Sequence, residues 1–273
     1  MSGDKPYVEV DLSGYETPII RVPTQEKFIG QLVTAIRYFF GKGSDTFAEH
    51  FPLKSSKGNF PFKGFILHGP PGSGKTEAVI DAGRRLRDEL GMDDGLDVNL
   101  FHVNSSNINR AAVGEMELRL QRVFSAATNS SSDHTRTIIL FDDIETLLTK
   151  RTDSNSREWT RSLNGVFFHE LDRLNSTKVM VVATTNVPEM IDPAVHSRLA
   201  SRSAPAPTVE EMIQVAKSAL PPGGAKGRSI EDLLEDTAKR IALNLAQNIP
   251  PSFRLARQSA IETLLNLVAG WEE

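Results

Sequence analysis

A glycine-rich octapeptide has the residue types to hold a row of phosphate groups, and in full it reads Gly69-Pro70-Pro71-Gly72-Ser73-Gly74-Lys75-Thr76. The run fits the pattern G-x-x-x-x-G-K-[ST], in which glycines let backbone N–H groups converge on phosphate oxygens. We expect Lys75 to reach the β and γ phosphates, and the hydroxyl of Thr76 to bind Mg²⁺. All eight residues together therefore predict a binding site for ATP with magnesium. The alternative is a tight strand-to-helix turn that binds no ligand.

Two consecutive carboxylates, Asp142 and Asp143, follow an apolar stretch at residues 137–141 that has the length of a strand. We expect Asp142 to hold the magnesium ion, directly or through water. Asp143 would then face the γ-phosphate and orient or deprotonate the attacking water. Glu145 lies two residues further on, past the expected site, and is the second candidate for the base. The alternative is that the aspartates only solvate the end of a strand.

A polar triplet, Thr184-Thr185-Asn186, ends another apolar stretch. In a parallel sheet the ligand collects at the carboxyl ends of the strands. Asn186 is therefore a candidate for polarising the attacking water. The alternative is an asparagine that is present only because it suits a turn.

Two arginines, Arg198 and Arg202, lie four residues apart and share one face of a helix if their segment is helical. One interpretation is an arginine finger that enters the site of a neighbouring subunit. The other is a solvated basic face. Arg254 and Arg257, in the last expected helix, pose the same choice.

The scaffold for these residues alternates between strands and helices as far as Pro207. Strands are expected at residues 62–68, 96–103, 137–141 and 179–184, and helices at residues 24–41, 76–90, 115–127 and 159–174. The second of these helices is expected to end at Gly91. This order predicts an α/β fold with a parallel sheet and helices on both faces.

The pattern changes after Pro207, where no strand signal remains. Helices are expected at residues 208–220, 230–246 and 252–271, separated by turns rich in proline and glycine. We therefore expect an extended arm at residues 1–23, an α/β domain at residues 24–206 and a small all-helical domain at residues 207–273.

The composition narrows the class of protein. The 273 residues include no cysteine, which excludes disulfides and thiolate metal sites. The net charge of −4 argues against a surface built for nucleic acid. No apolar run approaches the ~20 residues that a membrane-spanning helix needs, and the N-terminus has no signal-peptide pattern. We expect a soluble, cytoplasmic protein that does not bind a membrane.

Taken together and in this order, the motifs resemble those of the AAA+ ATPases, over about residues 24–265. Within that class, local runs are similar to the pachytene-checkpoint ATPases, which remodel HORMA-domain proteins. The similar runs are Phe141-Asp142-Asp143-Ile144-Glu145-Thr146-Leu147, Thr184-Thr185-Asn186-Val187-Pro188 and Ser252-Phe253-Arg254-Leu255-Ala256-Arg257. The resemblance implies a P-loop NTPase sheet followed by a helical lid. The roughly 23 residues before the first expected helix leave no room for a separate N-terminal domain, which suggests a bacterial form.

The resemblance also implies roles for individual residues. Asn186 is the sensor 1 residue, Arg198 is the first candidate for the finger with Arg202 second, and Arg254 is the sensor 2 candidate. A finger that acts on a neighbour requires a homo-oligomer, which in this class is usually a hexameric ring. The implied activity is ATP hydrolysis coupled to remodelling of a protein partner, with a HORMA-domain protein as one candidate.

Two departures from the family pattern affect that expectation. Asp143 stands where glutamate is usual, and its side chain is shorter by ~1.5 Å, a scale to which catalysis is sensitive. Ala112-Val113-Gly114 occupies the place of a substrate-gripping pore loop but lacks its aromatic residue. Residues 151–157 form either a second pore loop or a linker.

Two other functions are compatible with the same motifs. One is a slow nucleotide-dependent switch or assembly scaffold, in which Asp143 hydrolyses ATP poorly. The other is a nucleic-acid-directed loader, which the net acidity disfavours.

Overall fold

The computed structural model describes residues 5–14, 20–41, 62–109, 114–148 and 158–271. The chain forms two compact units. The first comprises Met1–Tyr15, Ile29–His68 and Thr76–Ser203, and the second comprises Glu16–Phe28, Gly69–Lys75 and Ala204–Glu273. The two domain boundaries expected from the sequence, after residues 23 and 206, remain predictions.

A six-stranded sheet forms the centre of the first unit, with the order β1-β3-β4-β5-β2-β6. The strands are β1 (Val8–Val10), β2 (Gly64–His68), β3 (Asp97–Asn104), β4 (Thr135–Asp142), β5 (Val179–Thr185) and β6 (Leu199–Ser203). Five strands are parallel, and β1 alone pairs antiparallel, with β3. The predicted α/β fold with a largely parallel sheet is confirmed.

Two edge strands were not predicted. The short strand β1 belongs to the arm that was expected only to be extended. The strand β6 occupies the segment in which the two arginines were to share a helix face, so that helical alternative is wrong. Leu199 is buried and pairs with Gly64 of β2, and this pairing decides the conformation.

Two helices of the α/β part are longer than the sequence indicated, two have the expected length with their bounds shifted by one residue, and one short helix was not expected. They are α1 (Pro23–Phe40), α3 (Lys75–Asp94), α4 (Ser105–Asn109), α5 (Glu115–Ser130) and α6 (Glu158–Arg173). The prediction that α3 ends at Gly91 was wrong. A glycine within a helix costs about 1 kcal/mol but does not stop it, and the chain leaves the helix at Gly95, where φ is +63°.

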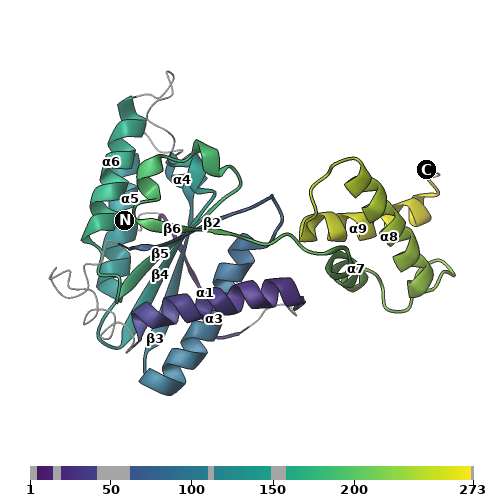
Figure 1. Ribbon diagram of the computed structural model, residues 1–273, viewed down its shortest axis with the longest axis horizontal. Coiled ribbons are helices and arrows are strands. Elements are labelled where there is room, and N and C mark those ends of the chain that lie inside the picture. The colour runs from purple at the N-terminus through teal and green to yellow at the C-terminus, as the bar shows by residue number, and fades with distance from the viewer. Residues whose placement is uncertain (1–4, 15–19, 42–61, 110–113, 149–157, 272–273) are drawn as a thin grey trace. The chain divides into compact units, whose positions relative to one another are not determined.

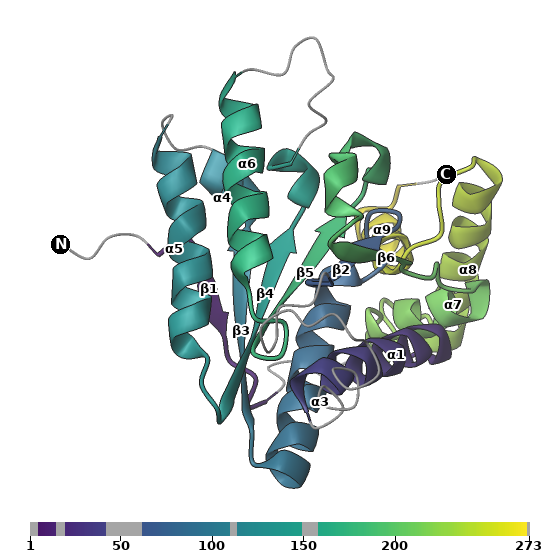
Figure 2. The same ribbon diagram turned by 60° about the vertical axis from the view of Figure 1, so that its left-hand side comes forward.

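Helices cover both faces of the sheet (Figures 1 and 2). On one face, α5 and α6 pack on alternate strand residues such as Phe101, Phe141 and Val181. On the other face α3 lies close to β3, since a Cβ added to Gly83 would lie 3.0 Å from Leu100. Both sets of strand side chains are buried, which explains the continuous apolar runs in the sequence.

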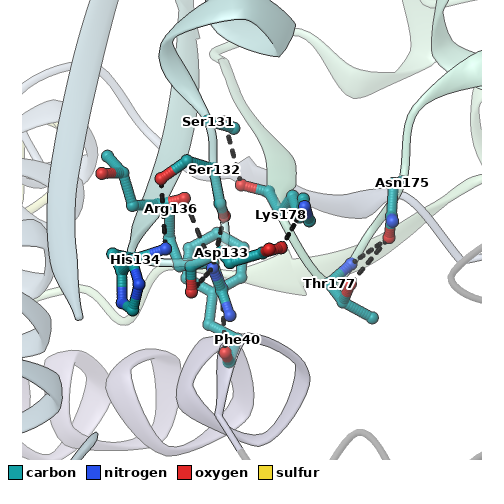
Figure 3. Close-up of polar contacts among 10 residues, drawn as sticks. Phe40, Ser131, Ser132, Asp133, His134, Arg136, Asn175, Thr177 and Lys178 are labelled. Carbon is teal, nitrogen blue, oxygen red and sulfur yellow. Dashed lines mark hydrogen bonds and ion pairs between the residues drawn. The ribbon is translucent and has the colours of Figure 1, made fainter. Parts of the chain in front are cut away.

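Hydrogen bonds fix the amino-terminal ends of β4 and β5 (Figure 3). Lys178 pairs with Asp133 at 2.7 Å, and Ser131 Oγ donates to the carbonyl of Ala127 at 2.8 Å. Arg136 Nε donates to the carbonyl of Phe40, in the last turn of α1, at 3.0 Å. These contacts lie at the opposite end of the strands from Asp142, so we assign them to the scaffold.

The C-terminal part of the second unit is helical, with α7 (Val209–Ser218), α8 (Ile230–Ala246) and α9 (Phe253–Ala269). Thr208, Ser229 and Ser252 cap these helices with their hydroxyls. The core joins Met212, Leu233 and Ala256 from the three helices, and Val22 of the predicted arm is buried in the same cluster. Among the described residues, no helix is both long and apolar enough to span a membrane.

Candidate functional site

The carboxyl ends of β3, β4 and β5 form one edge of the sheet in the first unit. The strands are adjacent and parallel, and Asn104 of β3 is in register with Asp142 of β4. Residues that end or follow these strands therefore lie close together. In open α/β sheets this edge is where ligands bind.

Asp142 lies at this edge and accepts two hydroxyl hydrogen bonds. Thr76 Oγ1 donates to Asp142 Oδ1 at 2.8 Å, and Thr184 Oγ1 donates to the same oxygen at 2.5 Å. His102 Nε2 lies 3.6 Å from the other carboxylate oxygen. Burial opposes ionisation, but the interaction with His102 and the hydrogen bonds from Thr184 and Thr76 outweigh it and lower the pKa of Asp142 to about 2.

The pair Thr76 and Asp142 fits a magnesium ion. Mg²⁺ prefers oxygen ligands and is commonly bound through one or two carboxylates together with substrate phosphates. The pair offers a hydroxyl and a carboxylate that is ionised at neutral pH. The structure thus brings together the two residues that the sequence proposed as metal ligands.

His102 and Thr184 were not singled out from the sequence as contacts of Asp142. Thr184 belongs to the polar triplet that ends β5, so the triplet was a signal for it. His102 lies in a strand that also contains the polar residues Asp97 and Asn99, and only the register of β3 with β4 shows that it faces Asp142.

Asp143 adopts a left-handed backbone conformation, with φ of 50° and ψ of 54°. Aspartate tolerates this region better than most residues. The conformation is held by Thr184 Oγ1, which accepts the Asp143 N–H at 3.2 Å, and by Thr146, which donates its N–H and its hydroxyl to the Asp143 carbonyl at 3.0 and 2.9 Å. The Asp143 side chain is exposed.

Asn186 contacts both acidic residues of the turn after β4. Its side-chain Nδ2 donates to Asp143 Oδ1 at 2.9 Å, and its backbone N–H donates to Glu145 Oε1 at 3.1 Å. The expectation that Glu145 lies past the site is therefore wrong. The short 3₁₀ helix Ile144–Thr146 turns the chain back toward β5 and brings Glu145 against Asn186.

The glycine-rich loop is held by contacts within the second unit. Gly72 and Gly74 have φ of +77° and +79°, and a Cβ on Gly72 would lie 2.5 Å from the Cβ of Arg254. Gln25 Nε2 donates to the Gly74 carbonyl at 3.1 Å. Both the positive φ and the close approach require glycine at position 72.

Lys75 is buried, and its ammonium group lies against the loop itself. Nζ donates to the carbonyls of Gly69 and Pro70 at 2.9 and 3.1 Å. The loop is further closed by the Ser73 N–H, which donates to the Pro70 carbonyl at 3.2 Å. Pro71 lies between these contacts in the chain.

Arg254 lies in the first turn of α9, next to the loop. The neighbouring Phe253 donates its N–H to the Gly72 carbonyl at 3.0 Å, and the buried Ser252 accepts the Leu255 N–H at 3.1 Å. The structure thus brings the sensor 2 candidate beside the loop residue Gly72. Arg257 follows one turn later and is exposed.

Arg198 and Arg202 have different surroundings. Arg198 Nε and Nη2 donate to the two carboxylate oxygens of Asp172 at 2.6 and 2.8 Å, and its guanidinium lies 5.1 Å from the Phe168 ring. Arg202 Nη1 donates to the adjacent Ser201 carbonyl at 2.8 Å, and its guanidinium lies 6.0 Å from the centre of the Phe65 ring. Neither residue contacts Asp142 or Asp143 of its own chain in the described structure.

The two candidate pore-loop segments lie outside the described residues, apart from Gly114. Ala112, Val113 and residues 151–157 belong to the part that the structure does not describe. Gly114 has φ of +89° and precedes α5, and its N–H donates to Glu117 Oε2 at 3.1 Å.

Comparison with protein families identifies the class. The model described as "ATPase family associated with various cellular activities (AAA)" matches residues 65–204, which is more than half of the 273 residues. The chain belongs to this family, as its motifs suggested. The match covers β2, the phosphate loop, both acidic residues, Asn186 and the arginine segment.

Curated relatives match over part of their length. An "AAA ATPase forming ring-shaped complexes" of Bifidobacterium dentium is 32% identical over 136 residues, which are 50% of this chain and 25% of that protein. A "Proteasome-associated ATPase" of Kineococcus radiotolerans is 26% identical over 224 residues, which are 75% and 38% of the two chains. "Fidgetin-like protein 1" of Drosophila melanogaster is 31% identical over 154 residues, which are 55% and 27%. The chain thus spans well under half the length of these relatives.

A solved structure shares the fold over almost the whole chain. It is a chain of the "Structure of E. coli MS115-1 HORMA:CdnC:Trip13 complex". The superposition has a TM-score of 0.60 and covers 94% of each chain, and the two sequences are 18% identical. At this level of identity the likeness establishes the fold and not the activity.

Proposed function

We propose that this protein hydrolyses ATP and uses the energy to remodel or partly unfold a protein partner. The main support is the arrangement at the strand ends, where Asp142 contacts Thr76 while Asp143 contacts Asn186. Membership of the AAA family supports nucleotide binding by the same residues.

In this proposal the glycine-rich loop binds the phosphates of ATP. Backbone N–H groups from Gly69 to Gly74 receive phosphate oxygens, and Lys75 exchanges its carbonyl partners for the β and γ phosphates. Magnesium, bound by Thr76 and Asp142, would neutralise charge on the phosphates.

Asp143 is the proposed base. Its carboxylate is exposed and can accept a proton from a water molecule, while the amide of Asn186 fixes one of its oxygens. Asp143 is shorter than the glutamate usual in the family. The left-handed backbone at position 143 suits aspartate and changes the direction of the side chain, so a short residue need not be misplaced.

The arginines complete the proposed site. Arg254 would reach the γ-phosphate from the first turn of α9, and Arg198, with Arg202 as second candidate, would act on the site of a neighbouring copy. This arrangement requires a ring of several copies, for which we propose a hexamer. The name of the Bifidobacterium relative, which describes ring-shaped complexes, supports the assembly.

The proposed partner is a protein, with a HORMA-domain protein as the first candidate. The support is the likeness of the runs around Asp142, Asn186 and Arg254 to the pachytene-checkpoint ATPases, together with a structural neighbour solved in a complex that contains a HORMA protein. The name of the Kineococcus relative refers to a proteasome, so a protein partner is common to both comparisons.

A slow switch is the second candidate function, because Asp143 replaces glutamate. Measuring phosphate release and ATP binding on the same preparation separates the two. Steady turnover that is lost in Lys75→Ala supports the proposed ATPase, whereas tight ATP binding without turnover supports the switch. Turnover that rises only when DNA is added would favour a nucleic-acid-directed protein. Capture of a HORMA-domain protein by the Asp143→Asn variant with ATP tests the partner.

A further inference from the structure

Two hydrogen bonds join the turn after β4 to the residue after β5, and Asn186 donates both. Its backbone N–H bonds to Glu145 Oε1 at 3.1 Å, and its side-chain Nδ2 bonds to Asp143 Oδ1 at 2.9 Å. Because Asp143 and Glu145 are two residues apart, the three residues form a closed ring. Glu145 therefore fixes the backbone from which the Asn186 amide extends.

The turn that carries Glu145 is itself well fixed. Thr146 donates both its N–H and its hydroxyl to the Asp143 carbonyl, at 3.0 and 2.9 Å. Ile144, which precedes Glu145, is fully buried against the core that α5 and α6 cover. The Glu145 carboxylate thus projects from a rigid support toward Asn186.

The second carboxylate oxygen of Glu145 is buried and accepts no hydrogen bond from any described residue. An unsatisfied buried polar group costs about 1–3 kcal/mol, and such groups in folded proteins call for an explanation. A carboxylate with one oxygen bonded to Asn186 and the other buried is badly placed to meet a water molecule. The exposed Asp143 is better placed.

We propose that Glu145 is a positioning residue, which holds the backbone of Asn186 so that the Asn186 amide is directed at Asp143. The inference rests on the proposed ATP hydrolysis and decides between the two candidates for the base. Asp143 takes the proton, and Glu145 acts only through Asn186.

Two substitutions at Glu145 separate positioning from proton transfer. Glu145→Gln keeps an Oε1 acceptor for the Asn186 N–H but cannot take a proton. Glu145→Ala removes the acceptor. We expect Glu145→Ala to lower kcat roughly 10- to 100-fold with KM changed by less than about threefold, since misplacement by an ångström has effects of this size. Glu145→Gln should recover kcat to within about threefold of wild type and keep its pH profile.

Glu189, exposed in the turn that follows Asn186, offers a matched control. Glu189→Ala removes an acid of the same kind without touching the ring and should leave kcat unchanged. If Glu145→Ala does not fold, Glu145→Asp replaces it, because the shorter carboxylate keeps the charge but withdraws the acceptor from Asn186. We expect the same loss of kcat from that variant.

Three results would overturn the proposal. Equal inactivity of Glu145→Gln and Glu145→Ala would make Glu145 the base. Full activity of Glu145→Ala would show that the contact is not needed. Parallel loss of ATP binding and of thermal stability, sufficient to account for the lower turnover, would make the role merely structural.

A readout without turnover separates this proposal from the proposed function. The side-chain amide signals of Asn186 in a ¹⁵N–¹H spectrum can be assigned by comparison with Asn186→Ser. Glu145→Ala should shift these signals, and Glu145→Gln should leave them close to their wild-type positions. If wild type hydrolyses no ATP, the proposed function fails while this test still applies. Unshifted signals in Glu145→Ala would overturn the positioning role by themselves.

Discussion

Arg198 and Asp172 form a bidentate ion pair, with guanidinium nitrogens 2.6 and 2.8 Å from the two carboxylate oxygens. The hydrogen bonds from Arg198 hold the pKa of Asp172 below its usual value. The guanidinium also lies over the Phe168 ring, 5.1 Å from its centre. The candidate finger is therefore held in a defined position by α6 of its own chain.

We expect Arg198→Ala to lower turnover by about 10³-fold or more, the size of effect that arginine fingers have in other phosphoryl-transfer enzymes. ATP affinity, measured with a fluorescent analogue, should change little because the proposed finger would act on the site of a neighbouring copy. Asp172→Asn weakens the ion pair but keeps Arg198 and its contact with the Phe168 ring, so it should lower turnover far less than Arg198→Ala. Full activity of Arg198→Ala would contradict the assignment of Arg198 and leave Arg202 as the candidate for the finger.

A second prediction follows if each ATP site is built from two copies of the chain. A mixture of Arg198→Ala and Asp143→Asn chains contains interfaces at which one copy supplies the finger and the other supplies the base. Such a mixture should recover part of the wild-type turnover, although each variant alone is inactive. Turnover no higher than that of the separate variants would contradict a finger that acts between copies.

Asp143→Asn should abolish proton transfer without disturbing the fold. Asparagine tolerates the left-handed backbone at this position as aspartate does, and its amide can still contact Asn186. We expect turnover to fall about 10²- to 10⁴-fold and the melting temperature to stay unchanged. A large drop in melting temperature would mean that the lower turnover reflects a damaged fold and not the loss of proton transfer.

The lowered pKa of the buried Lys63 predicts that the free energy of unfolding depends on pH. Burial lowers its pKa from 10.5 to about 8, although the nearby Asp172 partly opposes the shift, and Nζ donates to the Leu174 carbonyl at 2.7 Å. Between these two pH values the unfolded chain holds the proton and the folded chain does not. The free energy of unfolding contributed by Lys63 therefore rises with pH across that window and is least favourable below it.

Urea unfolding at pH 8 and pH 10 tests this dependence. Other groups titrate in the same range, so the useful quantity is the difference between wild type and Lys63→Met. Wild type should gain stability relative to Lys63→Met as the pH rises. A constant difference would contradict a buried amine with a lowered pKa.

Two glycine substitutions should change stability in opposite directions. Gly72→Ala must place a Cβ 2.5 Å from that of Arg254 at a φ of +77°, which costs of order 1–3 kcal/mol and should weaken ATP binding. Gly165 lies in α6 with open space around it, so Gly165→Ala should stabilise the chain by up to about 1 kcal/mol. Thermal unfolding of both variants checks the pair, and a stable Gly72→Ala that binds ATP would contradict the crowding.

Much of this fold could be predicted because its signals are local. The apolar stretch before Asp142 is buried on both faces, and its length and the two acids after it indicated both the strand and the site. The rule that parallel strands collect ligands at their carboxyl ends likewise made Asn186 a candidate site residue. These inferences needed no knowledge of which strands are neighbours, whereas the contact of Asn186 with Asp143 depends on β4 lying next to β5.

The features that were missed depend on pairing between distant segments. The strand β6 contains only five residues and is fixed by its register with β2, and no local pattern reveals that register. The contacts of Glu145 with Asn186 and of His102 with Asp142 likewise depend on neighbouring strands and on a single 3₁₀ turn. Sequence spacing alone placed Glu145 too far away because it assumed that the chain continues straight past Asp143.

The three-residue strand β1 limits how far this protein can be shortened at its N-terminus. It covers the free backbone of β3, and Val8 is in register with His102, whose ring lies beside Asp142. Removing the first dozen residues would leave the edge of β3 unpaired, and unpaired edge strands are a route to aggregation. It would also remove the pairing partner of His102, which lies beside Asp142, the proposed magnesium ligand. Deletions and fusions at the N-terminus therefore change the pairing of the central sheet and should be designed to keep β1.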